Sequence, residues 1–83
     1  MKQRKKGLES GKLSDVAEHQ KVKITSIDGD TRFLTRITSI GLTVGGIVQM
    51  VSNQKKRPLL VYSRNTLIAV NRKESEKIVV EVI

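Results

Sequence analysis

Hydrophobic and polar residues alternate along much of this chain of 83 residues, and the alternation predicts short β-strands. The segment 21–27 reads KVKITSI, a polar and apolar alternation that a half-buried strand requires, because successive side chains point to opposite faces. Apolar and β-branched residues predict further strands at 47–52, 59–62, 66–70 and 78–82. Polar or charged connections separate these segments, so we expect antiparallel strands joined by short loops.

One segment follows a helical period instead. The apolar residues of 31–40 fall at spacings that place them on one helical face: Phe33, Leu34, Ile37 and Ile40. Asp30 precedes the segment and is a favoured N-cap, because its carboxylate accepts hydrogen bonds from free backbone N–H groups. We therefore expect one short α-helix between the first and second strands.

Three of the six glycines follow this predicted helix within the stretch ITSIGLTVGG. Gly41 stands where a helix ends in the left-handed conformation that glycine adopts at least cost, and Leu42 stands where a Schellman motif places an apolar contact. Gly45 and Gly46 allow the chain to reverse into the next strand. These glycines have a structural explanation.

The two ends of the chain differ in character. Residues 1–12 carry five cations and one carboxylate (+5 − 1 = +4) without apolar periodicity, so we expect a flexible basic arm. Leu13 and Val16 flank Ser14, which predicts one helical turn capped by the serine hydroxyl. A second single turn is expected in the polar segment 71–76.

These elements predict a mainly β domain over residues 13–83. Five strands with one early helix indicate a small antiparallel β-barrel, because closing the sheet removes its exposed edges. A chain of this length forms one domain with a small core.

Composition excludes several classes of function. The chain has no cysteine and one histidine, and its carboxylates are dispersed, so we expect neither a transition-metal site nor a cofactor. No nucleophile, phosphate-binding loop or acid–base pair has the required spacing, and we predict that the protein is not an enzyme. No run of about 18 apolar residues provides a membrane span.

The net charge of +8 favours an anionic partner: nucleic acid, an anionic membrane or an acidic protein face. Single-strand binding proteins stack bases on aromatic side chains, and this chain has only Phe33 and Tyr62. A small basic barrel that binds nucleic acid is therefore the alternative hypothesis rather than the first.

Two groups of cations have open interpretations. Arg32 and Arg36 stand one turn apart on the predicted helix, where like charges slightly disfavour the helix, so either a bound anion or solubility explains them. Lys55, Lys56 and Arg57 stand at the tip of a predicted hairpin, where a solvated loop is the simpler interpretation and an acidic partner the alternative.

The order of these features resembles the FeoA (ferrous iron transport protein A) family, small cytoplasmic SH3-like barrels that accompany the membrane transporter FeoB. The most specific element is Ile40-Gly41-Leu42 followed two residues later by Gly45. The same barrel also occurs as the C-terminal domain of iron-dependent repressors. The segments that carry the resemblance are 13–16, 22–27, 32–45, 58–61 and 67–80.

The resemblance implies a non-catalytic accessory protein that binds the cytoplasmic part of FeoB and supports or regulates ferrous iron uptake. Its expected location is the cytoplasm, or the inner face of the membrane through this partner, and self-association is a further expectation. Leu42 has two expected roles, as the apolar clasp and as a contact. The residues expected to contact the partner are Arg32, Arg36, Leu42, Thr43, Val44, Lys55, Lys56 and Arg57.

Overall fold

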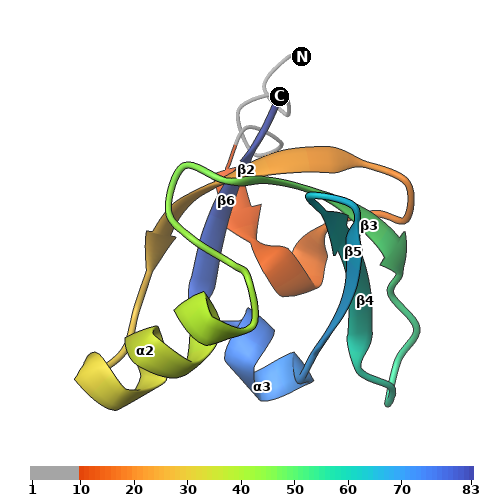
Figure 1. Cartoon of the computed structure of the whole chain (residues 1–83). Helices are drawn as coiled ribbons and strands as arrows, with labels where there is room; N and C mark the ends of the chain where they lie inside the picture. The colour runs from red at the N-terminus through yellow and green to blue at the C-terminus, as the bar shows by residue number, and fades with distance from the viewer. Residues whose placement is uncertain (1–9) are drawn as a thin grey trace.

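The computed structural model describes residues 10–83, which form one curved antiparallel sheet with short helices on it (Figure 1). The sheet order is β1-β6-β2-β3-β4-β5. The strands are β1 (Ser10–Lys12), β2 (Lys21–Ile27), β3 (Ile47–Ser52), β4 (Leu59–Ser63), β5 (Thr66–Val70) and β6 (Ile78–Val82). The helices are the 3-10 helix η1 (Leu13–Asp15) and the α-helices α2 (Thr31–Ser39) and α3 (Arg72–Ser75).

The five strands expected from the sequence are all present, and β1 is an additional strand. It lies within the segment assigned to the basic arm and pairs antiparallel with β6, with Gly11 opposite Val80. This three-residue strand contains no apolar side chain and therefore has no detectable period. Residues 1–9, the rest of the predicted arm, lie outside the described residues.

The prediction of a closed five-stranded barrel is wrong in both strand number and closure. Within residues 10–83, β1 pairs only with β6 and β5 pairs only with β4, so the sheet remains open. Its curvature includes shifts of register at Ile24/Ser26 and Met50/Ser52, irregularities of the kind that bend strands. The turn η1 lies inside the curve and contacts α3, so helical segments cover part of the core without strand pairing (Figure 1).

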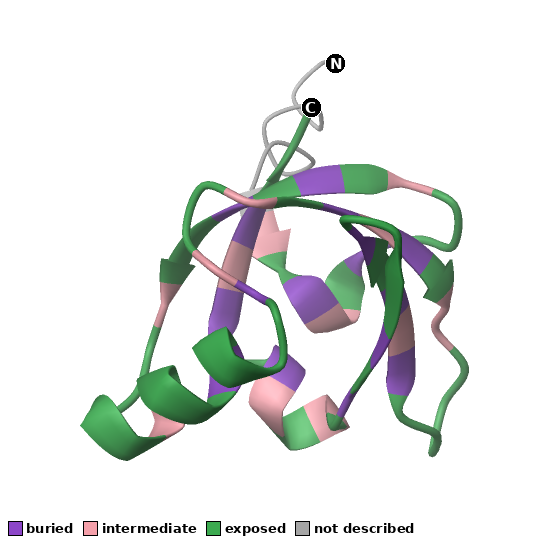
Figure 2. Cartoon of the chain, in the orientation of Figure 1, coloured by how far each residue is buried: buried purple, intermediate pink, exposed green. Residues whose placement is uncertain are grey.

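The core lies on the concave side of the sheet, and buried positions alternate with more exposed ones along β2 to β6 (Figure 2). Helix α2 contributes only Ile37 as a fully buried side chain, whereas Phe33 is half-buried and Leu34 and Ile40 are partly exposed. The predicted apolar face of α2 therefore exists, but only the helical turn that contains Ile37 packs fully on the core. The core side chains are Leu13, Val16, Val22, Ile24, Ile37, Leu42, Val48, Met50, Leu59, Val61, Ile68, Val70, Ile78 and Val80.

Both predicted ends of α2 are confirmed. The Asp30 Oδ1 atom accepts a hydrogen bond of 2.9 Å from the backbone N–H of Phe33. At the other end the Gly41 N–H donates to the Thr38 carbonyl at 3.0 Å, and the Leu42 N–H donates to the carbonyl five residues earlier at 3.2 Å. Gly41 has φ 107° and Leu42 is completely buried, which is the Schellman arrangement.

The next glycine attaches the connection after α2 to the sheet. Gly45 has φ 91°, and its N–H donates to the Ile24 carbonyl at 2.7 Å, while the Gly46 carbonyl accepts from the Ile24 N–H at 2.9 Å. These bonds fix the start of β3 beside β2.

Two alanine substitutions separate the conformational cost from crowding. A Cβ at position 45 meets no atom within 4 Å, whereas a Cβ at position 41 lies 3.2 Å from Ile68 Cδ1. We expect Gly45→Ala to lower the free energy of unfolding by about 1 kcal/mol and Gly41→Ala by about 1–2 kcal/mol, because both force alanine into a left-handed conformation. Urea unfolding measures both, and wild-type stability of Gly41→Ala contradicts the proposed importance of this cap.

Candidate functional site

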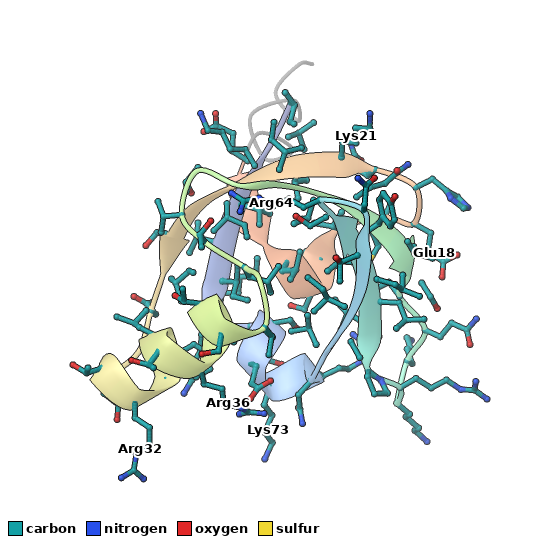
Figure 3. All side chains as sticks on the ribbon, in the orientation of Figure 1. Glu18, Lys21, Arg32, Arg36, Arg64 and Lys73 are labelled. Atoms are coloured by element: carbon teal, nitrogen blue, oxygen red, sulfur yellow. The ribbon has the colours of Figure 1, made fainter. Side chains whose placement is uncertain are left out.

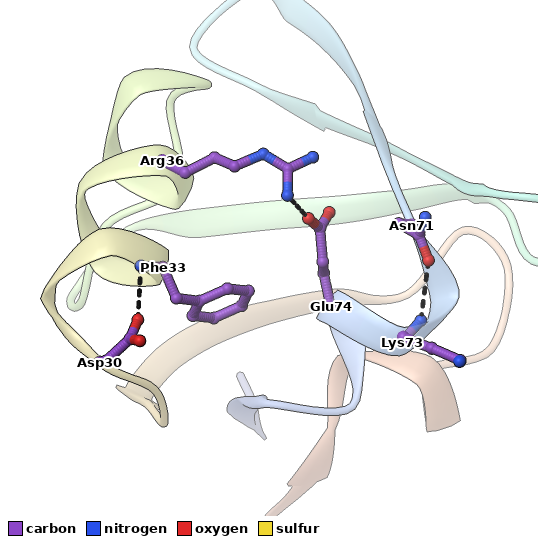
Figure 4. A network of polar contacts seen from close by, with 6 residues as sticks. All are labelled: Asp30, Phe33, Arg36, Asn71, Lys73 and Glu74. Atoms are coloured by element: carbon purple, nitrogen blue, oxygen red, sulfur yellow. Dashed lines mark hydrogen bonds and ion pairs between the residues drawn. The ribbon is translucent and has the colours of Figure 1, made fainter.

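The two arginines of α2 have different surroundings. The guanidinium of Arg36 forms an ion pair with the carboxylate of Glu74 in α3, and the Glu74 side chain is mostly buried (Figure 4). Arg32 is exposed and its side chain extends away from the domain (Figure 3). The two therefore do not form one outward contact face as the sequence suggested, since Arg36 already has a partner within the chain.

The connection after α2 also divides the predicted contact residues. Leu42 is completely buried, which removes its side chain from any contact surface, because the clasp role takes the whole side chain. Thr43 is half-buried and its carbonyl accepts from the Gly46 N–H at 3.0 Å. Val44 is exposed and remains available to a partner.

A cluster of exposed apolar side chains lies on the outer face of the sheet beside the β4–β5 turn. Tyr62 and Leu67 are opposite each other in the β4–β5 pair, with exposed fractions of 43% and 57%. Ile47 of β3 is 53% exposed and lines one depression together with Tyr62 and Arg64. A second depression joins Arg64 to Ile40 at the end of α2. We call Ile47, Tyr62, Arg64 and Leu67 the hairpin surface.

The β4–β5 turn holds Arg64 at the centre of this surface. Arg64 and Asn65 have φ values of 50° and 62°, as a two-residue turn of type I′ requires. The Tyr62 hydroxyl donates to Asn65 Oδ1 at 3.0 Å, and the Ser63 hydroxyl donates to the Ile47 carbonyl at 3.3 Å. The turn was predicted, but the surface was not. The sequence signal for this surface is that outward positions of three strands carry apolar residues, although such positions usually carry polar ones.

The predicted basic loop between β3 and β4 is exposed at Lys55, Lys56 and Arg57. Lys56 has φ 67°, a left-handed conformation that is uncommon for lysine. Arg57 donates its backbone N–H to the Gln54 carbonyl at 3.2 Å, which closes the loop on itself. The loop is therefore turned sharply at the point where its cations stand.

One side chain, Asn53, anchors this loop to the first turn of the domain. Its Nδ2 atom donates to the carbonyl of Ser14 at 3.1 Å and to that of Val16 at 2.8 Å. The predicted N-cap role of Ser14 is wrong, because η1 begins after Lys12 and has no side-chain cap. The turn itself and its buried residues Leu13 and Val16 are as predicted.

The same asparagine also joins the loop to α3. Its Oδ1 atom accepts from Arg72 Nη2 at 2.7 Å, and Arg72 Nη2 also donates to the Gln54 carbonyl. The Asn53 N–H donates to Glu18 Oε2 at 2.8 Å. Asn53 and Arg72 escaped the sequence reasoning because their partners are 18 to 39 residues away and leave no local pattern.

The described residues also bear on metals and membranes. Residues 10–83 contain no cluster of three or more histidine, cysteine or carboxylate side chains arranged to hold a metal ion. Within the same range, every helix is too short or too polar to cross a membrane.

Comparison with known proteins identifies relatives of this arrangement. The family model described as FeoA domain matches residues 11–82. Comparison with curated proteins gives no match. A crystal structure described as iron uptake regulatory protein (FeoA) has a TM-score of 0.85 at 19% identity, covering 89% of this chain and 99% of that chain. The solution structure of the FeoA protein from Chlorobium tepidum has a TM-score of 0.77 at 23% identity, covering 87% and 70%.

A second group of similar structures consists of repressors. A manganese-dependent transcriptional repressor has a TM-score of 0.82 at 13% identity, and the match covers 89% of this chain but only 37% of the repressor. At such identities these similarities show the fold alone. The open sheet is thus a variant of the small SH3-like β fold.

We expect Asn53→Ala to lower the free energy of unfolding by about 2 kcal/mol, because it leaves two backbone carbonyls and the Arg72 guanidinium without this partner. Gln54→Ala is the matched control, since only its backbone carbonyl takes part in the network. The control is expected to change stability by no more than about 0.5 kcal/mol. Equal urea midpoints for the two variants contradict a central role for Asn53.

Proposed function

This chain belongs to the FeoA domain family, whose members take part in ferrous iron transport, and on that premise we propose that it is a non-catalytic regulator of ferrous iron uptake. Its proposed partner is the cytoplasmic part of the membrane transporter FeoB. The proposed location is accordingly the cytoplasm, with attachment to the inner face of the membrane through that partner.

The hairpin surface is the observation that supports a protein partner. Ile47, Tyr62 and Leu67 expose apolar side chains side by side on a sheet face that usually carries polar residues. Tyrosine and arginine are enriched at the centres of protein interfaces, and here Tyr62 and Arg64 line the same depression. The surface therefore has the composition of a binding site for another protein.

The other predicted contact residues have secondary places in this proposal. Val44 precedes β3 by a few residues and extends the apolar character of this part of the chain, and Arg32 is an exposed cation on α2. Lys55 to Arg57 stand at the far end of β4 from the hairpin turn. Self-association through the hairpin surface competes with partner binding, because both use the same apolar side chains.

Titration calorimetry against the isolated cytoplasmic domain of the same organism's FeoB tests the proposal, with and without guanine nucleotide. We expect saturable binding that persists at physiological salt, because docking of an apolar surface depends weakly on ionic strength. Mixed DNA and RNA serve as the control. Salt-labile binding to nucleic acid, together with no binding to FeoB, refutes the proposal and favours the nucleic-acid alternative.

A pair of matched substitutions locates the contact. Ile47→Ser in the hairpin surface is expected to weaken FeoB binding by about tenfold or more, the loss typical of a residue at the centre of an interface. Ile83→Ser removes an apolar side chain of similar exposure, 66% against 53%, from the end of β6 and should leave affinity unchanged. Equal affinities of both variants move the contact away from the hairpin surface.

A further inference from the structure

Four cations from two distant segments line one depression at the opposite end of β4 from the hairpin surface. Its volume is about 510 Å³. The connection between β3 and β4 provides one wall, and the beginning of α3 provides the other. We call it the basic cleft, and its lining residues are Lys56, Arg57, Pro58, Asn71, Arg72 and Lys73.

The positive charge of the basic cleft is not neutralised by its own lining. None of the six lining residues is acidic. The neighbouring Glu74 carboxylate is paired with Arg36, and the Glu18 carboxylate, which accepts from the Asn53 N–H, keeps its negative charge but is not part of the lining. Four cations around one depression repel one another, and a bound anion relieves that repulsion.

The cleft is held in shape by contacts that do not use up its outer donors. Arg72 is fixed by Asn53 Oδ1 and the Gln54 carbonyl, so it locks the loop against α3. Asn71 Oδ1 accepts from the Lys73 N–H at 3.0 Å, which leaves the Asn71 amide nitrogen as a donor (Figure 4). Lys56, Arg57 and Lys73 have exposed side chains. The donors are therefore presented from a fixed frame.

The backbone of Lys56 is a second, independent observation. Its φ of 67° is a conformation that glycine adopts without the steric cost that lysine bears. A cationic side chain thus occupies a position where stability alone favours glycine. This departure supports the hypothesis that the Lys56 side chain has a role outside the fold.

We propose that the basic cleft binds a small molecule carrying two or more adjacent phosphate groups. Phosphate oxygens accept charge-assisted hydrogen bonds from lysine and arginine, and several acceptors in a row match several donors around one depression. The volume is that of a small-molecule site rather than of one phosphate. No aromatic side chain lines the cleft, so a nucleobase adds little to the binding affinity. This inference does not depend on the proposed binding to FeoB.

Residue-resolved NMR titration of the full chain with pyrophosphate, orthophosphate and ADP, at physiological salt, tests the proposal. We expect saturable shifts confined to residues 54–58 and 71–73, with pyrophosphate binding about tenfold more tightly than orthophosphate. Equal affinities for pyrophosphate and ADP identify the phosphates alone as the ligand, and tighter binding of ADP identifies a nucleotide as the source. Shifts confined to the N-terminal cations, or equal affinities for orthophosphate and pyrophosphate, overturn the proposal.

Matched lysine variants separate a site from general charge. Lys56→Gln is expected to weaken pyrophosphate binding by about tenfold, as loss of one charge-assisted contact does, whereas Lys23→Gln on β2 removes the same charge and should change affinity less than twofold. If both variants weaken pyrophosphate binding equally, the anion is attracted by the net charge of the protein, and the proposal of a specific site is overturned.

A third variant gives a readout beyond charge. Lys56→Gly should raise the urea midpoint, because glycine adopts the left-handed conformation without the steric cost that lysine bears. The same variant should weaken pyrophosphate binding as much as Lys56→Gln does. A glycine variant that binds as tightly as the wild type overturns the role of the Lys56 side chain even though it folds.

Discussion

The hydrogen bonds of Asn53 are the constraint on which the open side of this domain depends. The sheet does not close by pairing β1 with β5, so the turn η1, the β3–β4 loop and α3 must be held together by other means. One amide side chain does this by donating to the carbonyls of Ser14 within η1 and Val16 just after it, and by accepting from Arg72 of α3. Backbone carbonyls in partly buried positions require such partners, and water reaches them poorly. The ion pair between Arg36 and Glu74 extends the same assembly to α2, but its arginine is largely exposed and so adds little stability.

The assembly held by Asn53 lies between two surfaces, one apolar and one basic, at the two ends of β4. β4 begins next to Pro58 at the basic cleft and ends at Ser63 beside the hairpin turn, and five residues of strand span roughly 17 Å. The apolar hairpin surface and the basic cleft therefore do not overlap, and occupation of one leaves the other open. The β4 strand and the Asn53 network lie between the two surfaces.

Features with a local cause could be predicted from the sequence, and features with a distant cause could not. Asp30, Gly41 and the alternation within 21–27 act on neighbours within a few residues, and the structure confirms each of them. β1 was missed because its pairing with β6 is made by backbone groups and leaves no apolar period. Arg36 was grouped with Arg32 because its ion-pair partner Glu74 is 38 residues away and leaves no local pattern. For Leu42 the local clasp was recognised, and its side chain is fully buried in that role.

The backbone conformations show at which positions the residue present is not the one that stability favours. Among the described residues, left-handed φ values occur at four positions other than glycine: His19, Lys56, Arg64 and Asn65. Lys56 lies in the basic cleft and Arg64 in the hairpin surface, so both candidate surfaces contain a cation in a conformation that glycine adopts more easily. A domain of this size has little stability in reserve. The side-chain caps of both α-helices and the Schellman end of α2 follow local preference and offset part of that cost. Local and global preferences thus agree in the core, and they conflict at Lys56 in the basic cleft, at Arg64 in the hairpin surface and at His19, which lies in neither.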